Sequence, residues 1–198
     1  RDLHLSDFTA ADKTYDGTVA VSGTGFDDDR YSNDDLAFSY QAVFADKNAG
    51  NSKDVNYTEI SISGGTDSGN YSLQTISGTA TADINKKDLE VRTRVEDRNY
   101  GNRKAEVGGE YEGFKDGEDE SELTDKNFSL DTDYTQGDHV GIYNTIIEIG
   151  NATDNNYNFN ILTPTTFTVG KRDLHLSNFT AVDKTYDGTT AVSGTGFD

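Results

Sequence analysis

The sequence predicts an all-β protein in which small immunoglobulin-like β-sandwich modules follow one another in an extended rod. A β-grasp-like variant of each module is the alternative. Three observations predict this class. Short segments alternate between apolar and polar residues with a period of two, and β-branched residues are enriched in them. No stretch keeps a helical period for three turns. The chain also repeats its own opening segment, as tandem arrays of modules do.

The first 27 residues return almost unchanged at the end of the chain. Residues 1–27 and 172–198 differ only at Asp7/Asn178, Ala11/Val182 and Val19/Thr190, so the repeat has a period of 171 residues. We therefore interpret residues 172–198, the restart segment, as the beginning of the next copy of the first module. An enzyme rarely needs identical adjacent copies, whereas a stalk or fibre gains length from each one.

A fainter repeat divides this unit into two related modules. The segment TDSGNYSL (66–73) is echoed by TDNNYNF (153–159), and KKDLEV (86–91) is echoed by KRDLHL (171–176). These echoes predict a first module at 1–87 and a second module at 88–171.

Strands are expected in order along both modules, with turns between them. The alternating segments that predict strands are 57–63, 71–77, 79–84, 89–95, 142–149 and 165–169. Glycine-containing turns are expected at Asp16-Gly17, Gly64-Gly65 and Asp116-Gly117.

The junction between the modules carries a change of phase in the apolar pattern. Apolar residues occupy even numbers up to Ile84 and odd numbers from Leu89 onward, and such a shift moves the buried face to the other side of a strand. No Gly-Ser-rich or Pro-rich stretch separates the two patterns. We therefore expect the last strand of one module to run into the first strand of the next through a short, stiff linker of about four residues.

The composition narrows the choice of partners. A formal charge of −19 repels nucleic-acid phosphates and anionic lipid, and no apolar run approaches the length of a membrane helix. There is no cysteine, so neither disulfides nor thiolate metal sites can hold the fold. The expected partners are neighbouring repeats of the same chain and like filament subunits, with no nucleic acid and no membrane insertion in this segment.

Several motifs are similar to those of known bacterial modules. KTYDGTVAVSGTGF (13–26) and the segment SGGTDSGNYSLQTISGTATADINKKDL resemble the YDG module, named after Tyr15-Asp16-Gly17. The segment from Leu89 to Lys171, which opens with VEDRNYG, resembles the MBG module of the YGX type. The resemblance implies a long, repetitive protein at the cell surface, such as an adhesin or a filamentous-haemagglutinin-like protein, with an extracellular location and a structural or adhesive role. It brings no catalytic residues.

Two acidic clusters are the candidate metal sites. Calcium takes six to eight oxygen ligands, largely from carboxylates and carbonyls. Neither cluster has the spacing of an EF-hand loop, so solvated acidic loops are the alternative. The calcium candidates are Asp27, Asp28, Asp29, Asp34, Asp35, Asp116, Glu118, Asp119 and Glu120.

Tyr15, Tyr100 and Tyr186 occupy one equivalent position before a turn. We expect each ring to pack while its hydroxyl holds a backbone group; a carbohydrate-stacking platform is the alternative. The histidines, His4, His139 and His175, give only two independent positions, and their spacing suggests neither a metal site nor a catalytic relay. We therefore expect a protein that is not an enzyme.

The function predicted from the sequence is a structural repeat that acts as a stiff stalk in an extracellular filament or long surface adhesin. The alternative is a repeat that itself binds glycan, matrix or another cell. Isopeptide cross-links through Lys13 or Lys87 are a further option, as are glycans at the sequons Asn56, Asn70, Asn127, Asn151 and Asn178.

Overall fold

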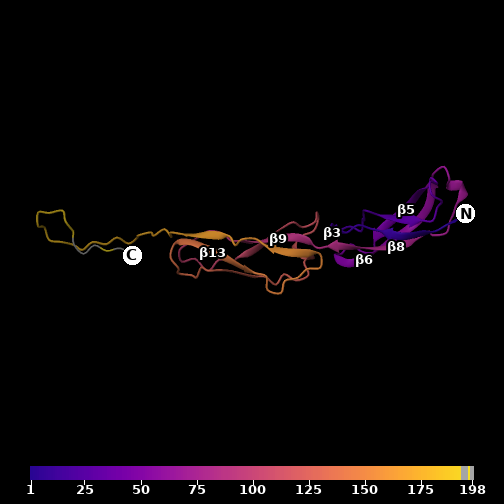
Figure 1. Ribbon diagram of the computed structural model, residues 1–198. Helices are drawn as coiled ribbons and strands as arrows, with labels where there is room; N and C mark the ends of the chain where they lie inside the picture. The colour runs from indigo at the N-terminus through magenta and orange to yellow at the C-terminus, as the bar shows by residue number, and fades with distance from the viewer. Residues whose placement is uncertain (193–195, 197–198) are drawn as a thin grey trace.

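A computed structural model describes residues 1–192 and 196 and shows an elongated all-β protein, as the sequence predicts (Figure 1). The first module lies at the amino-terminal end and the second module follows it along the same axis. The elements of the first module are β1 (Asp2–Leu3), β2 (Leu5–Thr9), β3 (Lys13–Thr14), β4 (Gly25–Asp28), β5 (Ala37–Phe44), β6 (Gly50–Gly64), the 3₁₀ turn η1 (Ser68–Asn70), β7 (Ser72–Leu73) and β8 (Gly78–Asn85).

Two layers of strands form the first module. One is a four-stranded sheet in the order β3-β8-β6-β5, in which β3 pairs with β8 in parallel and the other pairs are antiparallel. The other is built on β1 and β2, which are separated only by His4: β1 pairs in parallel with β7, and β2 pairs antiparallel with β4.

The second module has the same strand topology. Its elements are β9 (Lys87–Arg94), β10 (Arg98–Asn99), β11 (Gly108–Glu112), the 3₁₀ turn η2 (Glu120–Glu122), β12 (Ser129–Thr132), β13 (Gly141–Glu148), β14 (Tyr157–Ile161) and β15 (Thr166–Gly170). The sheet order β10-β15-β13-β12 repeats β3-β8-β6-β5, and β11-β9-β14 repeats the layer built on β1 and β2. Each parallel or antiparallel pairing is also repeated. The two halves of the repeat therefore share one topology.

Most of the segments predicted as strands are strands, and one is largely wrong. The predictions at 57–63, 79–84, 89–95, 142–149 and 165–169 fall on β6, β8, β9, β13 and β15. Of 71–77, only Ser72–Leu73 forms a strand, because its partner β1 is two residues long and Ile76 then turns out to solvent. The only helical elements in 1–192 and 196 are three-residue turns, so the helix of a β-grasp fold is not found there.

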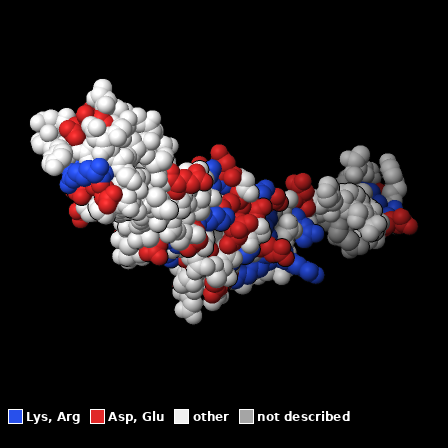
Figure 2. Space-filling model, turned by 90° about the vertical axis from the view of Figure 1, so that its right-hand side faces the viewer, with Lys and Arg blue, Asp and Glu red and all other residues white. Residues whose placement is uncertain are grey.

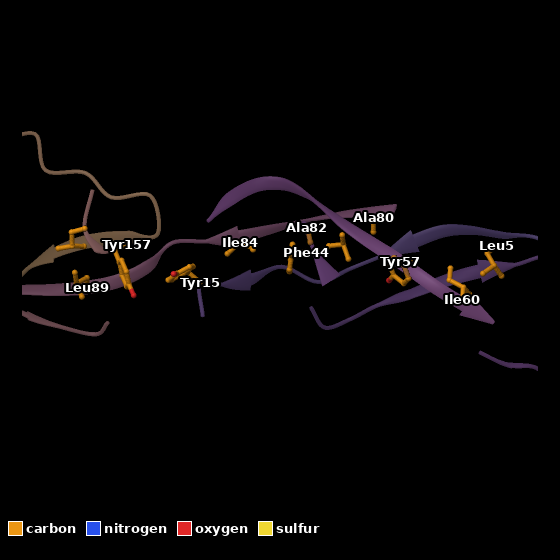
Figure 3. Packing of buried hydrophobic residues seen from close by; sticks show 12 residues of the cluster. Leu5, Tyr15, Phe44, Tyr57, Ile60, Ala80, Ala82, Ile84, Leu89 and Tyr157 are labelled. Carbon is orange, nitrogen blue, oxygen red and sulfur yellow. The ribbon is translucent and has the colours of Figure 1, made fainter. Parts of the chain in front are cut away.

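One hydrophobic core runs through the first module and into the second. It combines Phe44, Val55, Tyr57 and Ile84 of the first module with Leu89, Leu123 and Tyr157 of the second. Figure 3 shows the labelled side chains of this core in a row along the strands, with Tyr15 between Ile84 and Tyr157. A smaller cluster of Ala105, Tyr134, Phe167 and Val169 fills the far part of the second module.

The apolar phase change at the junction is confirmed by burial. Ala80, Ala82 and Ile84 are buried on β8, and Leu89 and Val91 are buried on β9. The linker is shorter than predicted, because Lys86 alone separates the two strands.

The restart segment leaves the second module as an extended chain (Figure 1). Its side chains are exposed where their copies in the first module are buried: Leu174 is 85% exposed against 0% for Leu3, and Tyr186 is 94% exposed against 3% for Tyr15. Residues 193–195, 197 and 198 of the predicted restart lie outside the described part of the chain. The described restart residues therefore show the sequence of a first module without its packing.

Candidate functional site: the junction between the modules

The junction begins with two strands that form a nearly continuous backbone. β8 ends at Asn85 and β9 begins at Lys87, so a single residue must reverse the buried face. Lys86 is held in place because its ammonium group donates a hydrogen bond of 2.6 Å to the carbonyl oxygen of Asp154 in the second module. The backbone N–H of Lys87 donates to the carbonyl oxygen of Asn156 at 2.9 Å. The linker is thus bonded to the module that follows it.

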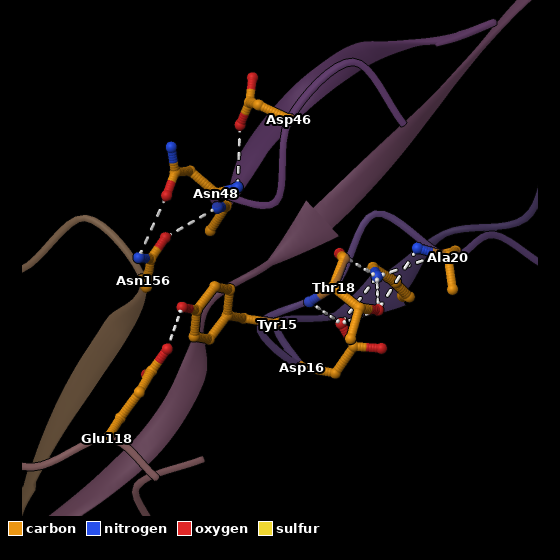
Figure 4. Close-up of polar contacts among 10 residues, drawn as sticks. Tyr15, Asp16, Thr18, Ala20, Asp46, Asn48, Glu118 and Asn156 are labelled. Carbon is orange, nitrogen blue, oxygen red and sulfur yellow. Dashed lines mark hydrogen bonds and ion pairs between the residues drawn. The ribbon is translucent and has the colours of Figure 1, made fainter. Parts of the chain in front are cut away.

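A carboxylate bridges two tyrosines across the junction. The Tyr15 hydroxyl of the first module donates to Glu118 Oε1 at 2.7 Å (Figure 4). The Tyr157 hydroxyl of the second module donates to Glu118 Oε2 at 2.5 Å. The two rings meet edge to face with their centroids 5.6 Å apart, an arrangement that stabilises aromatic pairs. Tyr15 and Glu118 are 103 residues apart in sequence, so this contact belongs to the assembled junction.

The ionisation of these groups is shifted by the bridge. Burial raises the pKa of the Tyr157 hydroxyl to about 12, and the hydrogen bond to Glu118 acts in the same direction. Burial followed by the bond to Glu118 raises the pKa of Tyr15 as well. Burial alone would raise the pKa of Glu118, but the hydrogen bonds from Tyr157 and Tyr15 and the charge of Lys47 outweigh it and lower that pKa. The bridge therefore exists as one carboxylate and two neutral phenols across the neutral pH range.

A second contact joins the loop between β5 and β6 to the loop before β14. The Asn156 side chain accepts a hydrogen bond of 3.0 Å from the backbone N–H of Ala49 and donates one of 3.4 Å to the Asn48 side chain (Figure 4). Lys47 lies 3.7 Å from Glu118 and adds an ion pair. The backbone at Asn156 is fixed by the buried carboxylate of Asp154, which accepts from its N–H at 2.7 Å. The junction is therefore held by two sets of contacts, one at Glu118 and one at Asn156.

The Tyr15-Asp16-Gly17 motif builds the first module's side of the junction. Asp16 accepts hydrogen bonds from the Lys13 ammonium and from the Thr18 N–H, and Lys13 also donates to the Ala20 carbonyl oxygen. Although burial opposes it, this bonding lowers the pKa of Asp16 to about 2. Gly17 has a φ of +74°, and a Cβ on it would lie 3.3 Å from the Lys115 side chain. The positive φ favours glycine here, and a side chain at this position would also press against the Lys115 side chain of the second module.

The predicted turns are present at all three positions. Gly17, Gly65 and Gly117 each have a positive φ, the conformation that favours glycine.

The first group of calcium candidates is engaged by protein groups. Asp28 forms a bidentate ion pair with Arg30, with distances of 2.6 and 2.7 Å. Asp29 accepts from the His4 N–H. Asp34 and Asp35 accept hydrogen bonds from the Tyr71 hydroxyl and the Thr66 N–H, respectively, and Asp27 is exposed on β4.

The second group is also spread over separate roles. Glu118 forms the bridge, Asp119 accepts from the Ser121 N–H at the start of η2, and Asp116 and Glu120 are exposed. Within residues 1–192 and 196, no three histidine, cysteine or acidic side chains are grouped so that they could hold a metal ion. Calcium binding by these residues stays a prediction.

The prediction for the equivalent tyrosines is partly wrong. The Tyr15 ring packs in the core as expected, but its hydroxyl bonds a carboxylate of the other module, where a backbone group was expected. A buried Tyr15 cannot serve as a carbohydrate platform, whereas Tyr100 and Tyr186 are exposed. His4 is exposed beside Asp29.

Sequence reasoning missed Tyr157 and Asn156. The signal was the echo between 66–73 and 153–159, which places an Asn-Tyr pair in each module.

Acidic and basic side chains lie side by side on the surface. Figure 2 shows them gathered mainly in the middle of the visible face, beside a broad part with few charged groups. In the part of the chain that the structure describes, no helix has the length and apolar character needed to cross a membrane.

Comparison with known families assigns both halves of the repeat. The family model of the YDG domain matches residues 1–81, and that of the MBG domain (YGX type) matches residues 89–168. No curated protein and no solved structure gives a significant match.

Proposed function

The chain consists of a YDG domain followed by an MBG domain of the YGX type, and we propose that it is a stiff repeat in the stalk of a long surface adhesin or extracellular filament. Both families are associated with surface adhesin-like proteins. The stalk would hold a binding tip away from the cell or assemble into a fibre. The proposal gives the chain an extracellular location, neighbouring repeats as its partners and no catalytic activity.

The observation that carries this proposal is the bonded junction between the two modules. Leu89 and Tyr157 share one core with the first module, and the Tyr15–Glu118 bond lies within the same contact. The end-to-end distance of a freely jointed chain of modules grows only as the square root of the number of modules. When the modules are held in line, that distance grows in proportion to their number. The junction therefore supports a role in which duplication of the repeat adds length.

The test compares polypeptides with one, two and three 171-residue repeats by electron microscopy and small-angle scattering. We expect the contour length to rise linearly, by about 70 to 90 Å per repeat for end-to-end modules with strands of about 3.3 Å per residue. Arrays whose radius of gyration grows only as the square root of repeat number, or compact globules, would refute the stalk.

A second candidate function, binding by the repeat itself, is favoured by one observation. An open groove of about 550 Å³ in the second module is lined by Arg94, Arg98, Arg103 and Lys104 together with Glu96 and Glu106. Four basic side chains on a strongly acidic protein would suit an anionic glycan. A screen of sulfated and neutral glycans, with R94A/R103A as the control, tests it; equal signals from the protein and the variant would count against binding in the groove.

A further inference from the structure

The two modules carry the same arrangement of groups at the end that faces the preceding module, which we call the upper end. In the second module, the Tyr157 hydroxyl donates to Glu118 and accepts from the Lys115 N–H at 3.0 Å. In the first module, the Tyr71 hydroxyl donates to Asp34 at 2.6 Å and accepts from the Tyr31 N–H at 3.0 Å. Asp34 is therefore the counterpart of Glu118.

The asparagine of the junction also has a counterpart. Asn70 precedes Tyr71 as Asn156 precedes Tyr157. The carbonyl oxygen of Asn70 accepts from the amino nitrogen of Arg1 at 2.7 Å, as that of Asn156 accepts from Lys87. The upper end of the first module thus repeats the surface that, in the second module, is covered by its neighbour.

The opposite end of each module, which we call the lower end, faces the module that follows. The lower end of the second module repeats the features of the lower end of the first module, which forms one side of the junction. The Tyr100 N–H donates to the last residue of β15, Gly170, at 2.9 Å, as the Tyr15 N–H donates to the last residue of β8, Asn85, at 2.8 Å. The Tyr100 side chain, however, is 42% exposed. Val140 precedes β13 as Ala49 precedes β6, and it is 46% exposed. This end has the docking residues of the first junction without a module against them.

The chain continues from this end into a copy of the first module. After β15 and Lys171, the restart segment begins with Arg172, which lies beside Gly101. Residues 172–198 repeat 1–27 except at three positions, so the opening segment of the first module recurs directly after the lower end. This recurrence favours a copy of the first module as the occupant of the lower end.

We propose that a second docking interface joins each second module to the next copy of the first module, in which Tyr100 donates its hydroxyl hydrogen bond to Asp34 of that copy. The Val140 N–H donates to the Asn70 side chain of the same copy. The inference rests on the proposed stalk. With this second interface, every junction of the array is bonded; without it, only every second junction would be.

The charge at the position of Lys47 differs between the two junctions. Lys47, which pairs with Glu118, lies three residues before β6, and the residue three before β13 is Asp138. The Asp138 carboxylate accepts from the Thr135 N–H in its own loop. The second interface therefore lacks the ion pair, and we expect it to be weaker than the first.

The test uses the full chain continued after Asp198 by a second copy of residues 28–171. Because the sequence has no cysteine, pairs of introduced cysteines can carry spin labels without background. Thr81 and Glu110 are exposed positions on either side of the first junction, and Thr166 and Ser39 of the added copy flank the second. Pulsed electron–electron double resonance then gives a distribution of spin-label distances for each junction.

We expect one narrow peak at each junction. Tyr100→Phe should broaden only the second peak, and Tyr15→Phe only the first. Asp34→Asn in the added copy should broaden the second peak, while the same change in the first copy should leave both peaks unchanged. Circular dichroism of each variant confirms that the strands are intact.

Two outcomes overturn the interface. A broad second peak beside a narrow first one removes it, and so does a narrow second peak that ignores both Tyr100→Phe and Asp34→Asn in the added copy. If the second peak stays narrow, the modules are still held in line and the stalk stands. If it is broad, only the two-module unit is stiff, and the scaling of array length with repeat number then tests the stalk separately. Broad peaks at both junctions would remove both proposals.

Discussion

At the scale of single residues, the repeat offers the same side chain in two environments. Tyr15 is buried and bonded to Glu118, whereas Tyr186, its copy, is 94% exposed. The local sequence around both is nearly identical, so the difference arises from the rest of the first module and from the second module, which together form the core around Tyr15. The contribution of the Tyr15 hydroxyl to the free energy of unfolding can therefore be measured with Tyr186 as an internal control.

We predict that Tyr15→Phe lowers the free energy of unfolding by about 1 to 2 kcal/mol, since hydrogen bonds to charged groups contribute about 1.5 to 3 kcal/mol and Glu118 keeps its bond to Tyr157. The ring packing is preserved by phenylalanine. Tyr186→Phe should change nothing measurable. Urea unfolding of both variants is the measurement, and equal effects would show that the hydroxyl does not stabilise the junction.

The stability that the Glu118 bridge gives to the junction depends on pH. The folded-state pKa of Glu118 is lowered, so the unfolded chain binds more protons in acid, and the bridge's contribution is present above the ordinary value of 4.5 and lost as pH falls below it. The pKa values of Tyr15 and Tyr157 are raised, so their contribution is present below pH 10 and lost above it. Glu118→Gln should flatten the acid limb of stability against pH. An unchanged acid limb in this variant would assign that dependence to other carboxylates.

At the scale of elements, the turn that carries the Tyr-Asp-Gly motif is specified locally. In the restart segment, Lys184 donates to Asp187 and to the carbonyl oxygen of Ala191, as Lys13 donates to Asp16 and to that of Ala20. The bridge between Thr180 and Gly196 likewise repeats the pairing of Thr9 with Gly25. Local structure therefore forms in both copies, and packing forms only where the rest of the module is present.

The difference between locally specified structure and packing between distant segments explains which features could be predicted from the sequence. The alternation in β6, β8, β9, β13 and β15 marks strands with one buried face, and the Gly turns mark their ends. The contact between Tyr15 and Glu118 could not be predicted, because nothing local distinguishes Glu118 from the acidic residues around it. Its role depends on a tyrosine 103 residues away.

The one-residue linker at Lys86 should couple the unfolding of the two modules. Inserting Gly-Ser-Gly-Ser after Lys86 would separate Ile84 from Leu89 and release the bridge, since the two modules would no longer be held in register. We expect the thermal unfolding transition to split in two, one transition for each module. The matched control is the same insertion after Lys171, at the equivalent point after β15. If both proteins unfold as the unaltered chain does, the shared core does not couple the modules.

At the scale of the whole molecule, charge opposes compactness. The net charge of −19 is spread over an elongated shape, which keeps like charges farther apart than a sphere would (Figures 1 and 2). Self-repulsion also favours an extended array over a collapsed one. The shape and the charge of the molecule thus act in the same direction.

The dependence on salt separates this general effect from a specific calcium site. Because salt shortens the range of repulsion to about 10 Å at 0.1 M, we predict that the melting temperature rises with NaCl and then levels off. At equal ionic strength, Ca²⁺ and Mg²⁺ should give nearly the same melting temperature, since the acidic candidates with hydrogen bonds or ion pairs already have protein partners, as Asp28 does with Arg30. Scanning calorimetry across the three salts is the measurement. A stabilisation given by Ca²⁺ alone, removed by D116N/E120Q and retained in a variant changed at an acidic position outside the two clusters, would instead establish a calcium site at the second cluster; a fall in melting temperature with NaCl would show that ion pairs, not repulsion, dominate the surface.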